Sequence, residues 1–107
     1  YHLALVKGQS GSLIGALNDL NRVINEKEDF GRAYYNRGII KQRLQRFEEA
    51  IKDYSKAIKL EVKIADIYAR RAEMYLELGE KKKACTDLKN AVKLDDGYKD
   101  SYNNYCL

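Results

Sequence analysis

The sequence predicts an all-α fold in which antiparallel helix pairs stack side by side into a solenoid. The main observation is an internal repeat, because eight residues recur with the same identity 34 positions further along the chain. The first set is Tyr34, Arg37, Leu44, Ala50, Asp53, Ala57, Lys59 and Leu60, and the second is Tyr68, Arg71, Leu78, Ala84, Asp87, Ala91, Lys93 and Leu94. A period of this length is typical of stacked helical hairpins, since one hairpin cannot bury its apolar face alone. The composition agrees, with no proline and 34% charged residues to cover solvated helix faces.

The first part of the chain holds a fainter copy of the repeat, in which Ala16, Asp19 and Ile24 precede Ala50, Asp53 and Ile58 by the same interval. We expect residues 1–8 to be the remnant of a helix that the glycine-containing segment 8–11 ends. A second helix is predicted over about 13–25, with Ser12 as its N-cap.

The middle of the chain holds two predicted helix pairs, because apolar residues follow the 3.6-residue helical period there. The first pair is expected over about 32–44 and 47–60, and the second over about 65–78 and 81–94. Gly79 should end the first helix of the second pair, where a left-handed residue is favoured.

The last part of the chain begins with a turn signal at 95–97, followed by a predicted helix over 98–106. The whole chain is therefore expected to be one domain. Its predicted parts are a partial repeat over 1–30, repeats over 31–64 and 65–98, and a capping helix or truncated repeat over 99–107.

The two clearest copies resemble the tetratricopeptide repeat. The resemblance lies in the strings AYYNRG at 33–38 and FEEAIKDYSKAIKL at 47–60. It implies a right-handed superhelical solenoid of about three helix pairs plus a C-terminal helix. The family's aromatic residue is Tyr34 here, its close-contact glycine is Gly38, and its second-helix alanines are Ala50 and Ala57. The chain departs from the family pattern at Lys41, where tyrosine is usual, and at Val62 and Asp96, where proline is usual.

Small and large residues at repeated positions predict how the helices pack. Gly38, Ala72, Ala50 and Ala57 should lie where antiparallel helices approach most closely. Leu44, Leu60, Leu78 and Leu94 should fill the space between hairpins.

The charge pattern argues against nucleic-acid and membrane partners. The net charge of +4 arises from 20 basic and 16 acidic residues that are interspersed, so no basic stripe is present. No apolar run approaches the roughly 20 residues that span a bilayer. Because the chain starts at Tyr1 rather than Met, we expect an excised segment. The compartment stays unknown, with the cytoplasm favoured.

Two cysteines occupy apolar positions of the repeat. Cys85 takes the place of Leu17 and Ile51, and Cys106 that of Gly38 and Ala72. We expect both to be small buried hydrophobic residues rather than a disulfide or a metal site, because no metal-ligand spacing is present.

An enzyme is not expected, and neither is a cofactor. His2 is the only histidine, and it belongs to no recognisable catalytic constellation. The glycines near the start lack the strand and the Gly-Lys pair of a phosphate-binding loop. The lysine run 81–83 is interpreted as a solvated helix face.

Arginine and aspartate recur in step, at Arg37 and Arg71 and at Asp53 and Asp87, with Asp19 in the equivalent earlier place. The arginines could bind an anionic ligand or pair with aspartates between helices. We favour the structural pairing, because a joint should repeat with the fold, whereas a ligand contact need not.

The resemblance implies a concave face that binds peptides and is lined by the first helix of each pair. Projecting the repeat onto this chain predicts that the partner-binding residues are Arg32, Tyr35, Asn36, Ile39, Gln42 and Arg43 from one unit, and Asp66, Ala69, Arg70, Glu73 and Glu77 from the next. Tyr35 is the expected aromatic anchor. A clamp for a chaperone tail is not expected, because only Asn36 and Arg70 match that subclass.

The predicted function is therefore a protein–protein interaction scaffold that binds a peptide or protein segment in its concave groove. The alternative is a structural module that self-assembles by stacking through the ends of the solenoid. A homo-oligomer through the terminal helices is the partner that this alternative implies.

Overall fold

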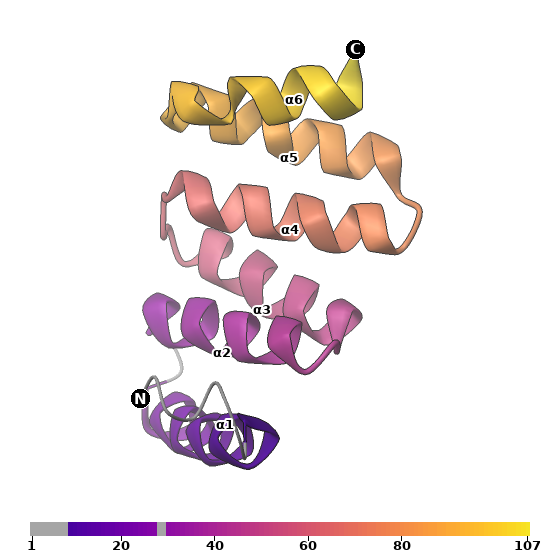
Figure 1. Cartoon of the computed structure of the whole chain (residues 1–107). Helices are drawn as coiled ribbons and strands as arrows, with labels where there is room; N and C mark the ends of the chain where they lie inside the picture. The colour runs from indigo at the N-terminus through magenta and orange to yellow at the C-terminus, as the bar shows by residue number, and fades with distance from the viewer. Residues whose placement is uncertain (1–8, 28–29) are drawn as a thin grey trace.

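The computed structural model describes residues 9–27 and 30–107, which form a single stack of helices (Figure 1). The elements are α1 (Gln9–Glu26), α2 (Gly31–Arg43), α3 (Phe47–Lys59), α4 (Ala65–Glu77), α5 (Lys81–Leu94), a short 3₁₀ turn η2 (Asp96–Tyr98) and α6 (Lys99–Cys106). No strand occurs within these described ranges, and the all-α solenoid prediction is confirmed. The helix predicted over 1–8, with Tyr1 and His2, lies outside them.

The helix ends agree with the sequence predictions to within one residue in both full pairs, α2/α3 and α4/α5. The prediction for the first helix was wrong. The helix α1 begins at Gln9, so Ser12 lies inside it and is not an N-cap, and Gly11 is helical rather than part of a loop. A glycine inside a helix costs only about 1 kcal/mol relative to alanine, and the burial of Leu13 and Leu17 against α2 offsets this cost.

The turn after α4 confirms the role predicted for Gly79, whose φ is +76°. The Gly79 N–H donates to the carbonyl of Leu76, and the Glu80 N–H donates to the carbonyl of Tyr75. These are the two hydrogen bonds of a Schellman motif, which satisfies carbonyls that the helix end leaves free. The same motif ends α2 and α3, but the left-handed residue there is not a glycine. It is Gln45, with a φ of 62°, after α2 and Glu61, with a φ of 67°, after α3.

The closest approach within a helix pair occurs at Gly38. A Cβ atom added there would lie 2.6 Å from Cε1 of Tyr54, whose side chain is fully buried. One repeat later the same two positions hold Ala72 and Leu88, which pack in one buried cluster. Leucine is smaller than tyrosine and leaves room for the alanine methyl group. Both helix pairs therefore stay in close contact, one through a glycine and a tyrosine and the other through an alanine and a leucine.

The leucines predicted to fill the space between hairpins do so in only one repeat. Leu44 packs against the buried cluster of Leu13, Leu17 and Ile40, and Leu60 lies beside Gly31.

The prediction was wrong for Leu78 and Leu94, which are 42% and 48% exposed. Other side chains fill the corresponding space. Phe47 and Met74 do so between α3 and α4, and Tyr98 packs beside Ala65 and Ala91.

The cysteine prediction was also wrong, because Cys85 on α5 and Cys106 on α6 form a disulfide with their Cα atoms 5.7 Å apart. Tyr102 and Cys106 lie one helical turn apart and pack together on the buried cluster of α4 and α5. This packing sets the register of α6 on α5 and brings the two cysteines together. Both cysteines occupy positions of the repeat, but the other copies have no cysteine there, so the 34-residue period could not indicate the pairing. Among the helices that the structure describes, none is both long and apolar enough to cross a bilayer.

Candidate ligand-binding groove

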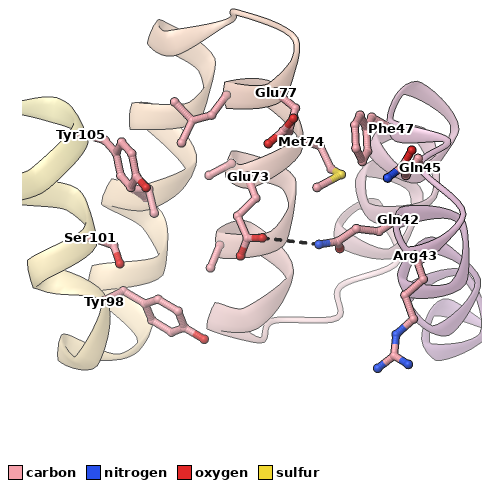
Figure 2. Close-up of a pocket in the computed structure, with 14 residues that line it drawn as sticks. Gln42, Arg43, Gln45, Phe47, Glu73, Met74, Glu77, Tyr98, Ser101 and Tyr105 are labelled. Atoms are coloured by element: carbon pink, nitrogen blue, oxygen red, sulfur yellow. Dashed lines mark hydrogen bonds between the residues drawn. The ribbon is translucent and has the colours of Figure 1, made fainter. Parts of the chain in front are cut away.

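A groove of about 850 Å³ runs along the face formed by α2, α4 and α6. Its central strip on α4 consists of Ala69, Ala72, Glu73, Met74, Leu76 and Glu77, with Leu88 of α5 beside it. One wall is formed by Gln42, Arg43, Gln45 and Phe47, and the other by Tyr98, Ser101 and Tyr105. Figure 2 shows Glu73 and Glu77 between Gln42 on one side and Tyr98 and Tyr105 on the other.

The helical period explains why α4 supplies the central strip. Most of its lining residues are spaced by three or four positions, which places them on one helix face. The small residues Ala69 and Ala72 are almost fully buried, whereas Glu73 and Glu77 are exposed. The strip therefore combines a low apolar floor with two carboxylates that rise from it.

A hydrogen-bonded network borders the groove and joins α2 to α4. The hydroxyl of Tyr35 donates to Asp66, and Nε of Arg70 donates to Oδ2 of Asp66 at 2.6 Å. Gln42 accepts from the Tyr54 hydroxyl at 2.7 Å and from NH1 of Arg70 at 3.4 Å. The network fixes the side chain of Gln42, which forms part of the groove wall.

The network also shifts the pKa values of its members. Burial, followed by the hydrogen bond to Asp66, raises the pKa of Tyr35. Burial alone would lower the pKa of Arg70, but the bond and charge of Asp66 outweigh it and raise that pKa. Asp66 and Arg70 thus form an ion pair within the network.

The two glutamates of the groove differ from Asp66 in their partners. Among the residues that the structure describes, neither Glu73 nor Glu77 forms an ion pair. Glu73 only accepts a long hydrogen bond of 3.5 Å from Gln42. The pKa of Glu73 is raised, first by partial loss of hydration and then by the negative charges of Asp66 and Glu77, while Arg70 opposes the shift. The groove therefore favours positive charge at this point.

The predicted partner-binding residues divide into four sets. Gln42, Arg43, Ala69, Glu73 and Glu77 line the groove. Tyr35, Asp66 and Arg70 form the bordering network, and Ile39 packs against the core. Arg32 and Asn36 are exposed on α2 outside the groove lining.

Sequence reasoning missed the wall that α6 provides. Ser101 occupies the position of Ile67 one repeat later. Ile67 is fully buried between α4 and the preceding helix pair. Because serine is much smaller, the corresponding space beside α6 stays open and extends the groove. The replacement of Ile67 by Ser101 in the repeat was the signal in the sequence that could have indicated this recess.

The repeated arginines are structural, as predicted. Arg37 donates to Asp53 from Nε at 2.9 Å and from NH2 at 2.7 Å, and Arg71 donates to Asp87 in the same way at 2.8 and 2.6 Å. Both carboxylates are almost fully buried. Each pair lies within one helix pair, and the hydrogen bond to Asp53 raises the pKa of Arg37.

The third donor of each of these arginines reaches back to the preceding unit. NH1 of Arg37 donates to Asn21, and NH1 of Arg71 donates to Ser55, both at 2.9 Å. Asp19 does not take part, since it pairs with Arg22 on the exposed face of α1. The guanidinium groups of Arg37 and Arg71 are therefore engaged in hydrogen bonds within the fold.

Comparison with known proteins places this arrangement in a family. Sequence models of the tetratricopeptide repeat match residues 31–62 and 65–98, which together make up more than half of the chain. The chain belongs to the tetratricopeptide repeat family. A search of curated proteins with this sequence found no match.

Several solved structures share the fold. MamA is similar with a TM-score of 0.81 and 22% identity over 90% of this chain, which spans 56% of the MamA chain. The first tetratricopeptide repeat domain of Spaghetti (RPAP3), bound to the HSP90 peptide SRMEEVD, has a TM-score of 0.82 and 18% identity, covering 91% of this chain and 79% of that one. The Yersinia enterocolitica chaperone SycD, in complex with a peptide of the translocator YopD, has a TM-score of 0.76 and 23% identity, covering 98% and 82%.

Proposed function

We propose that this repeat array is a non-enzymatic protein–protein interaction scaffold, which binds an extended segment of a partner protein in the groove between α2, α4 and α6. The groove is the observation that carries this proposal. Packed protein interiors leave few voids larger than a water molecule. An open groove of about 850 Å³, with an apolar floor and polar walls, is of the size that ligand sites have.

The array has the features that peptide recognition needs. Gln42 is held by Tyr54 and Arg70, so a polar group of the wall is already in place before a partner arrives. Such preorganisation reduces the entropy lost on binding. Structural relatives with the same fold, RPAP3 and SycD, have been solved with peptides bound, which supports the same class of function here.

The recess at Ser101 offers a direct test. Ser101→Ile restores the residue that the repeat has at Ile67 and fills the recess with no change of charge. Binders would be selected from a library of short random peptides, and their affinities measured by fluorescence anisotropy. We expect Ser101→Ile to weaken the selected peptides by about tenfold or more, because filled space excludes a side chain worth roughly 1.5–3 kcal/mol.

The matched control is Asn103→Ile, which places the same side chain at an exposed position of α6 outside the groove lining. It should leave affinity unchanged, and thermal melts would verify that both variants fold. Equal affinity in wild type and Ser101→Ile would refute binding in this groove. Self-assembly through the ends is the alternative, and a mass that rises with protein concentration in the absence of peptide would identify it.

A further inference from the structure

The charges in the groove differ from those of the chain as a whole. The chain carries a net charge of +4, but the groove lining contains two acidic side chains and one basic one. The basic one, Arg43, stands on the α2 wall, and Figure 2 shows its guanidinium directed away from Glu77. The nearby Arg70 is already bound to Asp66. Both charged side chains on the central strip of the groove, Glu73 and Glu77, are therefore acidic.

The two carboxylates lie one helical turn apart on α4 and can face a single ligand group between them. Partial loss of hydration raises the pKa of Glu73, although its side chain is exposed, so its negative charge is less well hydrated than that of a free glutamate. A cation at this point would restore the lost stabilisation through charge-assisted hydrogen bonds.

The opposite wall suits the rest of a basic side chain. Tyr98 and Tyr105 face the groove from η2 and α6, and Tyr105 is unusually exposed for an aromatic residue, at 51%. Tyrosine rings attract cations over their faces and pack against aliphatic stems. Lysine and arginine are the side chains that combine such a stem with a cation.

We infer that the groove selects partner segments in which a lysine or arginine side chain inserts between Glu73 and Glu77 on one side and Tyr98 and Tyr105 on the other. This inference rests on the proposed function and names the partner that the groove accepts. An apolar residue of the same segment fills the recess at Ser101, which lies on the same wall as the two tyrosines.

The experiment uses short random peptides displayed on phage and selected against the full chain. Peptides selected by wild type should carry lysine or arginine at a fixed distance from an apolar residue. The variant Glu73→Gln/Glu77→Gln should select peptides without this preference. The matched control is Glu26→Gln/Glu48→Gln, which removes the same charge from exposed positions outside the groove lining, and it should keep the preference.

A double-mutant cycle on the best peptide then tests the contact itself. Replacing its basic residue with norleucine, or using the Glu73→Gln/Glu77→Gln chain, should each weaken binding by about tenfold, the size expected for hydrogen bonds between charged groups. Both changes together should weaken binding little more than either alone, because they remove the same interaction.

Three outcomes would overturn the inference. Groove-dependent peptides without a fixed basic residue, or an additive cycle, would refute the basic contact and leave groove binding intact. A failure to select any peptide that Ser101→Ile weakens would refute the proposed function as well.

Discussion

At the scale of single residues, the joints between helices are built from buried charges. The carboxylates of Asp53 and Asp87 are held by two hydrogen bonds each from Arg37 and Arg71. Lys41 adds a third contact to Asp53 at 3.3 Å, and it stands where the second repeat has Tyr75. Lys41, which departs from the family pattern, therefore has a structural role, because its ammonium group contacts the buried carboxylate of Asp53.

These joints predict a large asymmetry between one-sided and two-sided substitutions. Arg71→Met should lower the free energy of unfolding by about 3–5 kcal/mol, because Asp87 would remain buried without its partner. Replacing both residues, as Arg71→Met/Asp87→Leu, should cost much less. Urea unfolding of the four chains in this cycle measures the coupling.

A second cycle distinguishes the possible partners of Arg37. Coupling should appear between Arg37 and Asp53, whereas Arg37 and Asp19 should be additive within about 0.5 kcal/mol, since the two are not in contact. The opposite pattern, or a loss of peptide binding with no loss of stability, would contradict the structural role of Arg37.

At the scale of helices, much of the fold could be predicted because it depends on repetition. The period of apolar residues placed both central helix pairs to within one residue. The start of α1 could not be predicted, because the local glycines favour a helix end. The helix continues through them because its apolar residues pack on α2. The disulfide and the α6 wall were missed because Cys85, Ser101 and Cys106 depart from the repeat instead of following it.

The same comparison holds for the candidate site. The α4 side of the groove could be predicted, because Glu73 and Glu77 follow from the helix period and the family frame. The pairing of Tyr35 and Arg70 with Asp66 could not, since it depends on side-chain orientations across two helices. Tyr35 remains a proposed partner contact, and it lies beside the groove rather than in its lining.

The contact between α2 and α3 depends on matched volumes. Gly38→Ala should lower the free energy of unfolding by about 1–3 kcal/mol, because the new methyl group would overlap the ring of Tyr54. Tyr54→Leu in the Gly38→Ala chain recreates the Ala72 and Leu88 combination of the next pair.

Thermal or urea unfolding of the single and double variants would measure this compensation. The double variant should be more stable than the sum of the single effects predicts, although it lacks the hydrogen bond from Tyr54 to Gln42. If the effects of the two substitutions were strictly additive, the overlap between the new methyl group and the Tyr54 ring would be relieved by movements of other residues. The control is Ala72→Gly, which should cost only the roughly 1 kcal/mol of helix propensity, plus a small cavity.

At the scale of the whole molecule, the Cys85–Cys106 disulfide connects stability with the groove. It ties α6 to α5 across a separation of 21 residues, and α6 carries Ser101 and Tyr105 of the groove wall. Removing the bond with Cys85→Ser/Cys106→Ser should cost about 3 kcal/mol by the loop-entropy estimate. Peptide affinity should fall in parallel, because α6 would open more often.

Amide hydrogen exchange would locate this effect. Exchange in α6 should accelerate far more than in α2 or α3, and adding a reductant to wild type should reproduce the double variant. Uniform acceleration across all helices would contradict a local role for the bond. Disulfides persist in oxidising compartments, so the strength of this effect in a cell depends on where the protein resides.

The raised pKa of Glu73 predicts opposite pH dependences for binding and for stability. Glu73 faces Gln42 across the groove and is influenced by Asp66, Arg70 and Glu77. Its folded-state pKa lies above the ordinary glutamate value of 4.5, so its contribution to stability is fully present below that value and is lost as pH rises through the folded-state pKa. Binding of a basic peptide needs the ionised carboxylate, so affinity should instead rise as pH increases through the same window, with a proton released on binding.

Glu73→Gln is the matched control for both measurements, since glutamine does not titrate. Anisotropy titrations and urea unfolding over a pH series beginning just above 4.5 should show the two opposite trends in wild type and flatten both in the variant. A wild-type affinity that does not change across the window would show that the Glu73 carboxylate makes no contact with the ligand cation. A trend that persists in Glu73→Gln would assign it to another group of the groove, with Glu77 the first to test, because it is the only other carboxylate in the groove lining that the structure describes.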